Sequence, residues 1–445
     1  PTTPLISLDL GEVLQRAQVI RGGAEPEDVG VEELFPKSTD EMDPVSVDLA
    51  RQIQESLERG DVDGAIAATD ALRRYEFAAH AQDELQTSVQ MVDPDPDTVE
   101  RAQDLVRTWE ERTRQRIAIL YTLSYPDRLE LLLITRDGEP VHRVVPEAGQ
   151  LTLSQAASEF RQSITNPLLR SQSSQYLPAA QQLYDYVIRP VEERLKLDNI
   201  DSVILSLSPE LRSTPIAALH DGEQYFIENY NFTLLPSFDA IDSKQQLERG
   251  SGVLALGASQ FEDPRQNPLP FVPVELETIT QKSWQGQSFL DESFTLENFL
   301  AQRQADPDAI VHLATHAEFR GGSLSESYIQ FGRERIGLND LERLQLDSPT
   351  INLLVLSACR TALGKPEAEL GFAGLSVQAG VRTAIASLWY VDDAATSVLM
   401  GQFYRHWADG DIATKSAALQ QAQVAVLTGQ ATIKDGNLMV KGVKG

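Results

Sequence analysis

Short apolar runs alternate with segments of helical periodicity from residue 201 onward. The runs read DSVILSL, GVLALGA, AIVHLAT, INLLVLSA and TAIASLW, and they occupy 201–207, 252–258, 309–315, 351–358 and 383–389. Near-continuous apolar strands separated by helices are typical of a parallel sheet whose two faces are both covered. The sequence therefore predicts an α/β fold with a mostly parallel sheet flanked by helices.

The N-terminal part of the chain has a different pattern. Apolar residues recur at helical spacing over 47–85, and Gly60 lies where a helix would end, so this segment predicts a helical hairpin. Residues 98–115 predict one more helix. The acidic, Gly- and Pro-rich stretch 22–44 has no apolar period and is expected to be a loop or disordered.

Strand-like runs begin at residue 116, where three of them precede two helical segments around 154–165 and 178–195. We therefore expect an acidic helical region over 1–115, partly disordered over 22–44, and a separate domain over 116–445.

Charge restricts the partners of this chain. The formal net charge is -28, and residues 1–100 hold 23 acidic against 7 basic residues. Such a field repels phosphate backbones, so we expect no nucleic-acid partner. It keeps the protein soluble or attracts a basic protein partner to the N-terminal helical region.

Cysteine usage and hydropathy restrict the compartment. The chain has 1 cysteine, which allows neither a disulfide framework nor a multi-cysteine zinc site. No run reaches the ~18 to 20 apolar residues of a membrane span, and no signal-peptide pattern opens the chain. We expect no membrane partner and a reducing compartment such as the cytoplasm. No phosphate-binding or dinucleotide-binding pattern occurs, so no cofactor is predicted. No calcium-loop pattern occurs either, so no metal-ligating residues are predicted, and metal dependence stays open.

Two reactive residues follow predicted strands. His316 comes directly after 309–315, and Cys359, the single cysteine, comes directly after 351–358. Functional groups of open α/β sheets gather beyond the carboxyl ends of strands, and neighbouring strands lie ~4.8 Å apart. A thiol of ordinary pKa ~8.5 is mostly protonated at neutral pH, so a nearby imidazole would favour the reactive thiolate. The pattern alone leaves open an inert buried cysteine that lies near a histidine by coincidence.

His312 is the alternative to His316 as a catalytic residue. It lies inside the apolar run, on the same face of the strand as His316 and deeper in the sheet. A polar residue at such a position is expected to be a hydrogen-bonded structural residue.

Several segments resemble one known family. They read HLATHAEF, VLSACRTALG, GFAGLSVQAGVRTAIASLWYVDDAAT and MGQFYRHW, preceded by YLPAAQQLYDYVIRPVEERL and ELRSTPIAALHDGEQYFIENY. In this order they resemble the CHAT family, bacterial caspase-fold cysteine peptidases that are related to separase and frequent in cyanobacteria. The resemblance begins near Ile117 and covers about three quarters of the chain, not residues 1–115. It implies a caspase-like sheet.

The resemblance also implies roles for individual residues. Cys359 corresponds to the nucleophile and His316 to its general base, with the backbone N–H groups of Ala317 and Cys359 as the oxyanion hole. The family has glycine where this chain has Ala317, and a positive φ there would strain alanine.

Substrate binding is implied by the segment SLWYVDDAAT, which resembles the substrate-pocket segment of separase. Asp392 or Asp393 would meet a basic side chain before the scissile bond (P1), or would cap the helix that follows. Trp389 is a wall of that pocket or part of the core.

The predicted function is therefore a cysteine endopeptidase for specific protein substrates, cleaving after Arg or Lys in regulatory proteolysis. The alternative is a catalytically silent caspase-like scaffold that recruits protein partners. A serine hydrolase is disfavoured because GLSVQAG lacks the second glycine of a nucleophile elbow. Family members commonly close with an aromatic-rich strand, and this chain ends in TIKDGNLMVKGVKG, so we expect a truncated C-terminus.

Overall fold

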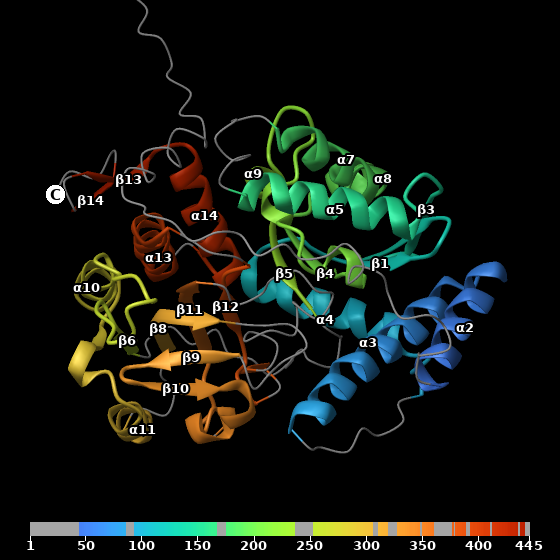
Figure 1. The fold of residues 1–445 in the computed structure, drawn as a ribbon. Coiled ribbons are helices and arrows are strands. Elements are labelled where there is room, and N and C mark those ends of the chain that lie inside the picture. Colours follow the sequence, from blue (N-terminus) through green and yellow to red (C-terminus); the bar gives the residue numbers. More distant parts are fainter. Residues whose placement is uncertain are drawn as a thin grey trace, which may run out of the picture. The chain divides into compact units, whose positions relative to one another are not determined.

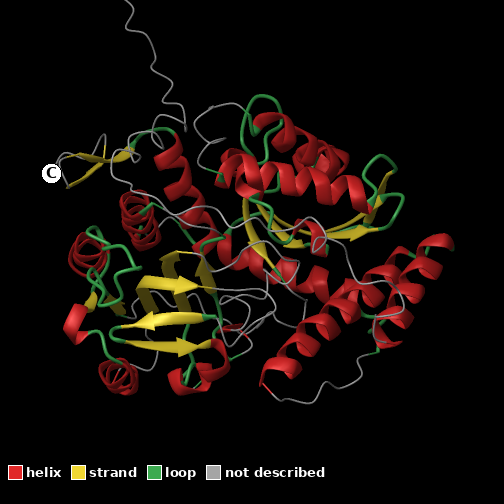
Figure 2. Ribbon diagram, viewed as in Figure 1, coloured by secondary structure: helices red, strands yellow, loops and turns green. Residues whose placement is uncertain are grey.

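The chain folds into two compact units, each with its own sheet (Figures 1 and 2). The structure is a computed structural model that describes residues 44–85, 93–166, 175–235, 252–305, 310–318, 327–347, 349–359, 376–377, 379–388, 392–409, 412–434 and 437–440. The first unit takes Pro1–Thr214, Leu219–Glu223 and Thr233–Ile241, and the second takes Pro215–Ala218, Gln224–Phe232 and Asp242–Gly445. No described helix is long and apolar enough to cross a membrane.

The first unit contains a five-stranded sheet in the order β3-β2-β1-β4-β5. Its strands are β1 (Ile117–Ser124), β2 (Leu129–Thr135), β3 (Val141–Val145), β4 (Ser202–Ser206) and β5 (Asn231–Leu234). The pairs β1–β2 and β2–β3 are antiparallel, and β1–β4 is parallel. The side chains of β2 are all buried, so both faces of the sheet are covered there.

Three helices precede this sheet and share its core. They are α2 (Pro44–Glu58), α3 (Val62–Leu85) and α4 (Thr98–Thr113). Gly60, with φ 72°, lies in the turn that joins α2 to α3. Leu49, Ile66 and Val106 of these helices pack in one cluster with Ile119 and Tyr121 of β1. Packing therefore groups the N-terminal helices with the first sheet, and the division at residues 115 and 116 stays a prediction.

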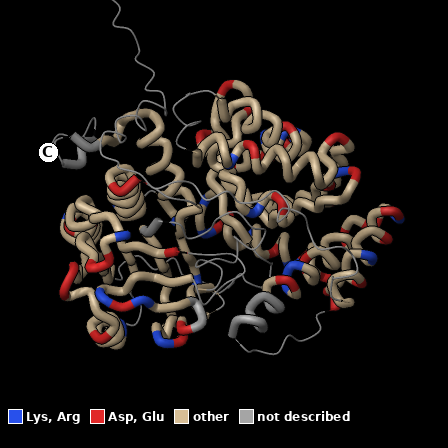
Figure 3. The backbone as a smooth tube through the Cα atoms, in the orientation of Figure 1, with Lys and Arg blue, Asp and Glu red and all other residues tan. Residues whose placement is uncertain are grey.

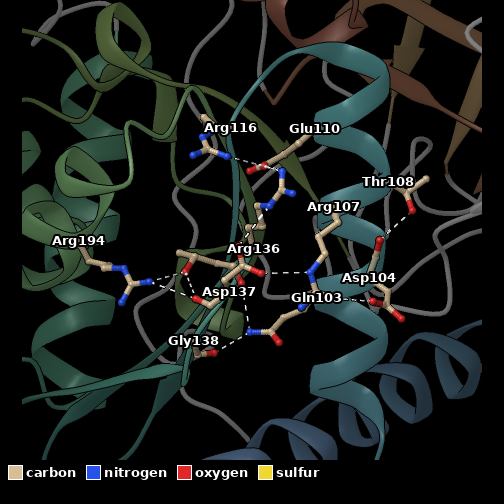
Figure 4. Close-up of polar contacts among 11 residues, drawn as sticks. Gln103, Asp104, Arg107, Thr108, Glu110, Arg116, Arg136, Asp137, Gly138 and Arg194 are labelled. Carbon is tan, nitrogen blue, oxygen red and sulfur yellow. Dashed lines mark hydrogen bonds and ion pairs between the residues drawn. The ribbon is translucent and has the colours of Figure 1, made fainter.

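Polar contacts fix α4 against the strands (Figure 4). The Glu110 carboxylate accepts the N–H of Ile117 at 3.0 Å and pairs with Arg116 at 3.0 Å and Arg136 at 3.2 Å. Gln103 donates to the carbonyl of Gly138 at 2.7 Å. Because Glu110 is buried, these partners are what makes its charge tolerable there.

The remaining helices of the first unit are α5 (Gln150–Thr165), α7 (Leu177–Val187) and α8 (Arg189–Leu197). They confirm the two predicted helical segments, except that the second is divided into α7 and α8. Pro190 lies in the first turn of α8, where proline cannot continue the hydrogen bonding of the preceding helix.

The second unit holds a parallel sheet in the order β7-β6-β8-β11-β12, extended by antiparallel β9 and β10 (Figure 1). Its strands are β6 (Val253–Gly257), β7 (Gly286–Leu290), β8 (Ile310–Glu318), β9 (Tyr328–Phe331), β10 (Glu334–Gly337), β11 (Leu353–Cys359) and β12 (Ala384–Ala386). Four predicted apolar runs become β6, β8, β11 and β12. The α/β class, with a mostly parallel sheet flanked by helices and preceded by helices, is confirmed.

Helices cover both faces of this second sheet. On one face, α11 (Leu296–Ala305) contributes Phe299 to a cluster with Leu313 and Leu356. On the other face, α13 (Asp393–Ala408) contributes Phe403 to a cluster with Val355.

Shorter elements complete the second unit. They are α9 (Phe226–Asn229), α10 (Val272–Glu277), the π-helical turn η7 (Thr278–Ser283), the 3-10 helix η10 (Leu338–Leu344), α14 (Lys415–Leu427) and the hairpin β13 (Ala431–Lys434) and β14 (Asn437–Val440).

Candidate active site

The two candidate catalytic residues end neighbouring parallel strands. In the ladder between β8 and β11, Cys359 is aligned with His316 as the final registered pair. Parallel strands lie about 4.8 Å apart, so the two backbones are as close at this point as the sheet allows. The side chain of Cys359 lies outside the described part of the chain, and that of His316 is described.

The ring of His316 is held by one hydrogen bond and one aromatic contact. Its Nε2 lies 2.8 Å from the carbonyl oxygen of Asn267, and its centroid lies 4.4 Å from that of Phe261. A carbonyl oxygen only accepts, so Nε2 carries the hydrogen, and Nδ1 is the basic nitrogen of the neutral ring. Burial lowers the pKa of His316 from its ordinary value of 6.5, and the bond to Asn267 offsets part of that effect.

The backbone conformation at position 317 is one that a residue other than glycine can adopt. It is buried in β8 and aligned with Ile329 of β9. Among the described residues, the non-glycine positions with positive φ are Arg114, Asn199, Asp291 and Gln345. Alanine therefore carries no left-handed strain here, and its N–H as an oxyanion donor stays a prediction.

His312 lies in a buried polar network beneath the strand ends. Its Nε2 is 2.9 Å from Glu275 Oε1, and its Nδ1 is 3.3 Å from the hydroxyl of Tyr404. The hydroxyl of Ser357 on β11 donates to the same Glu275 oxygen at 2.6 Å. His312, Glu275 and Tyr404 are at most 1% exposed, so His312 is a hydrogen-bonded structural residue, as expected.

Asp392 and Asp393 both have intramolecular partners. Asp392 is the N-cap of α13, because its Oδ1 accepts the N–H of Ala395 at 2.9 Å. Asp393 accepts the N–H of Phe271 at 2.8 Å. Burial raises the pKa of Asp393 to about 6, and the nearby charge of Glu275 adds to the shift. Trp389 lies outside the described residues, so the P1 pocket stays a prediction.

Three residues of the site went unnoticed in the sequence. Asn267 acts through its backbone carbonyl, and Phe261 acts through a ring contact, so neither leaves a sequence signal. Glu275 does leave one, because it is an acidic residue within the apolar stretch FVPVELETI. Among the described residues, no group of three or more His, Cys, Asp or Glu side chains is placed to hold a metal ion.

The family described as CHAT domain matches residues 177–437, more than half of the chain. A solved structure, the separase–securin complex of Saccharomyces cerevisiae, is similar at 12% identity and a TM-score of 0.48, over 87% of this chain. This chain spans 34% of that protein, about a third of its length. No curated protein matches the sequence. From the match over residues 177–437, the chain belongs to the CHAT domain family.

Proposed function

We propose that this protein is a cysteine endopeptidase in which Cys359 is the nucleophile and His316 the general base. The observation that carries the proposal is the register of the two residues at the carboxyl ends of β8 and β11. The bond from His316 Nε2 to Asn267 supports it, because this bond leaves Nδ1 as the nitrogen that accepts a proton. Membership of the CHAT family, which includes cysteine peptidases, agrees with it.

The chemistry divides amide hydrolysis into two steps. In the first, His316 Nδ1 takes the thiol proton while the sulfur of Cys359 attacks the substrate carbonyl carbon. The backbone N–H groups of Ala317 and Cys359 hold the oxyanion of the tetrahedral intermediate. The C–N bond then breaks, and the leaving amine takes the proton from His316. The product of this step is a thioester on Cys359.

In the second step a water molecule attacks the thioester. His316 Nδ1 takes one proton of that water and returns it to the sulfur when the C–S bond breaks. The acid product leaves, and the thiol and the neutral imidazole are restored.

The proposed substrates are proteins cleaved after Arg or Lys. Either aspartate is a candidate for that selection: Asp392 caps α13 through Oδ1, and Asp393 accepts the N–H of Phe271 through Oδ2. A cationic P1 side chain near Asp393 would return the pKa of that carboxyl toward its ordinary value of 3.8, since a neighbouring positive charge favours the ionised form.

Partners and compartment are part of the same proposal. The acidic N-terminal region is a proposed docking surface for a basic protein, and a reactive thiol suits a reducing compartment such as the cytoplasm. Figure 3 shows acidic and basic residues on the N-terminal helices, and the one basic residue of α2, Arg51, pairs with Glu55 at 2.7 Å.

A panel of peptide-coumarin substrates that differ at P1 tests the proposed function. We expect wild-type protein to release coumarin after Arg and Lys, and Cys359→Ala to release none. Equal release by both proteins would exclude Cys359 as the nucleophile. Retention of the biological effect by Cys359→Ala would instead favour the scaffold.

A further inference from the structure

The second unit contains a cavity of about 730 Å³. Its lining comes from the loop after β6, the turn after β7, and the β9–β10 hairpin that lies beside β8 in Figure 1. Phe261 belongs to this lining and also contacts the ring of His316, at 4.4 Å between centroids. The cavity and His316 therefore share Phe261 as a common wall.

The strand order gives this cavity a place along a bound substrate. From β11 the sheet continues through β8 to β6, so Cys359, His316 and the loop after β6, which carries Phe261, follow one another along its carboxyl edge. The general base gives its proton to the leaving amine, so the leaving part of the substrate extends past His316. Two strand spacings are about 10 Å, which an extended peptide spans in about three residues. The cavity thus lies near the second or third residue after the scissile bond (P2′ or P3′).

The lining is negatively charged. It contains the four carboxylates of Glu262, Asp263, Asp291 and Glu292 and the two guanidinium groups of Arg333 and Arg335. A cationic substrate group would bring the cavity closer to neutrality.

The carboxylates differ in how firmly they are bound. Asp263 pairs with Arg335 at 2.8 Å, and hydrogen bonds from Arg265 hold the pKa of Asp263 well below its usual range. Arg333 meets Glu262 at 3.2 Å and Glu292 at 3.8 Å, and these three side chains are 75%, 77% and 90% exposed. Exposed ion pairs of this kind contribute little free energy, so an incoming cation can replace Arg333 as the partner of the two glutamates.

Asp291 shapes the wall between the cavity and His316. It has φ 52°, a left-handed conformation that is costly for a non-glycine residue. Its Oδ1 accepts the N–H of Ser259 at 2.6 Å, which fixes the loop that carries Phe261. Asp291 is thus a positioning residue. Glu262 and Glu292, which pair with Arg333 at the exposed rim, are the carboxylates that an incoming cation reaches.

We propose that this cavity is a leaving-group subsite that receives a Lys or Arg side chain at P2′ or P3′ of the substrate. The inference rests on the proposed peptidase function, and it adds a second basic determinant on the other side of the scissile bond from P1.

Internally quenched peptides test the subsite. All carry Arg at P1, and they differ only by Lys, Ala or Glu at P2′ and P3′. We expect wild-type kcat/KM to be up to about fivefold higher for Lys than for Glu, which corresponds to one exposed ion pair. Glu262→Gln combined with Glu292→Gln should remove the preference, whereas the matched control Glu297→Gln, an exposed carboxylate on α11, should keep it. Equal kcat/KM for Lys and Glu in wild type would overturn the subsite.

Two further measurements separate this inference from the proposed function. Coumarin substrates end at P1 and contain no primed residues, so silence with all of them would count against the peptidase alone. In that case, fluorescence anisotropy with labelled Gly-Lys-Lys-Gly and Gly-Glu-Glu-Gly peptides decides the cavity. Tighter binding of the lysine peptide by Cys359→Ala protein, lost in the double glutamine variant, would support a cation subsite. Equal binding of both peptides would refute it.

Discussion

The chemistry of this site depends on how the ring of His316 is held. The carbonyl of Asn267 fixes the tautomer, and Phe261 covers one side of the ring. Burial disfavours the charged imidazolium, so the pKa of His316 lies below its ordinary value of 6.5 and the ring is neutral at pH 7. A neutral ring is the form that accepts the thiol proton.

This protonation state predicts the acid limb of the pH profile. Activity should fall only when pH drops below the lowered pKa of His316, so the midpoint in kcat/KM should lie below 6.5. Phe261→Ala exposes the ring to water and should move that midpoint upward, whereas Phe261→Leu keeps an apolar cover and should move it less. A wild-type midpoint above 7 would contradict this account of the ring.

Asp393 makes the stability of the fold depend on pH. Its pKa is about 6 in the folded protein against an ordinary value of 3.8, so between these two pH values the native state binds the extra proton. The free energy of unfolding should therefore fall as pH rises from about 4 to 6, by on the order of 2 kcal/mol. Asp393→Asn should remove this part of the decline. Urea unfolding at pH 4, 5, 6 and 7 measures it, and parallel curves for both proteins would contradict it.

One buried polar network links four elements of the second unit. Glu275 on α10 contacts His312 on β8 and Ser357 on β11, and His312 contacts Tyr404 on α13. The network lies four residues before His316 on β8 and two residues before Cys359 on β11. It fixes the two strands relative to each other near the site.

Replacing Glu275, the centre of this network, should lower the free energy of unfolding more than replacing Ser357 at its edge. Glu275→Ala leaves the His312 nitrogen and the Ser357 hydroxyl unsatisfied in a dry interior, with an expected loss of about 3 kcal/mol or more. Ser357→Ala removes one donor and should cost about 1 kcal/mol. Urea denaturation of both variants measures the difference in free energy of unfolding, and equal losses would contradict a central role for Glu275.

Helices and strands were predictable from the sequence where a pattern of neighbouring residues marks them. The apolar runs of β6, β8 and β11 alternate with amphipathic segments, and in the structure the runs form strands and the segments form helices. Strand β7 (Gly286–Leu290) was missed, because it lies at the edge of the sheet, is exposed over its first residues and has no apolar run. The contacts of His316 were missed because a backbone carbonyl at residue 267 comes near it only in three dimensions.

The N-terminal helices are part of the first unit's core. Leu49, Ile66 and Val106 are buried against β1 and its neighbours, and Glu110 pairs with Arg116 and Arg136. The sequence pattern predicted a domain boundary between residues 115 and 116, because helical periodicity gives way to strand-like apolar runs there. Composition does not report which apolar faces meet, so it could not reveal this shared core.

Deleting residues 1–115 should therefore unfold or aggregate the first unit. The truncated chain would expose the apolar face that Ile119 and Tyr121 present to the helices. Thermal unfolding and size-exclusion chromatography of the 116–445 chain measure the effect. A monomer whose transition matches that of the full chain would show that the helices are dispensable.

The most direct test of the Cys–His pair uses the fact that the chain has 1 cysteine. A peptidyl acyloxymethyl ketone with Arg at P1 alkylates an activated thiol. The sulfur bonds to the methylene carbon beside the ketone, the carboxylate leaves, and mass spectrometry locates the adduct. We expect one adduct per chain on Cys359, formed about a hundredfold more slowly in His316→Ala than in wild type, since general-base catalysis contributes about that much or more. No adduct in wild type, or the same rate in both proteins, would contradict the pairing of Cys359 with His316.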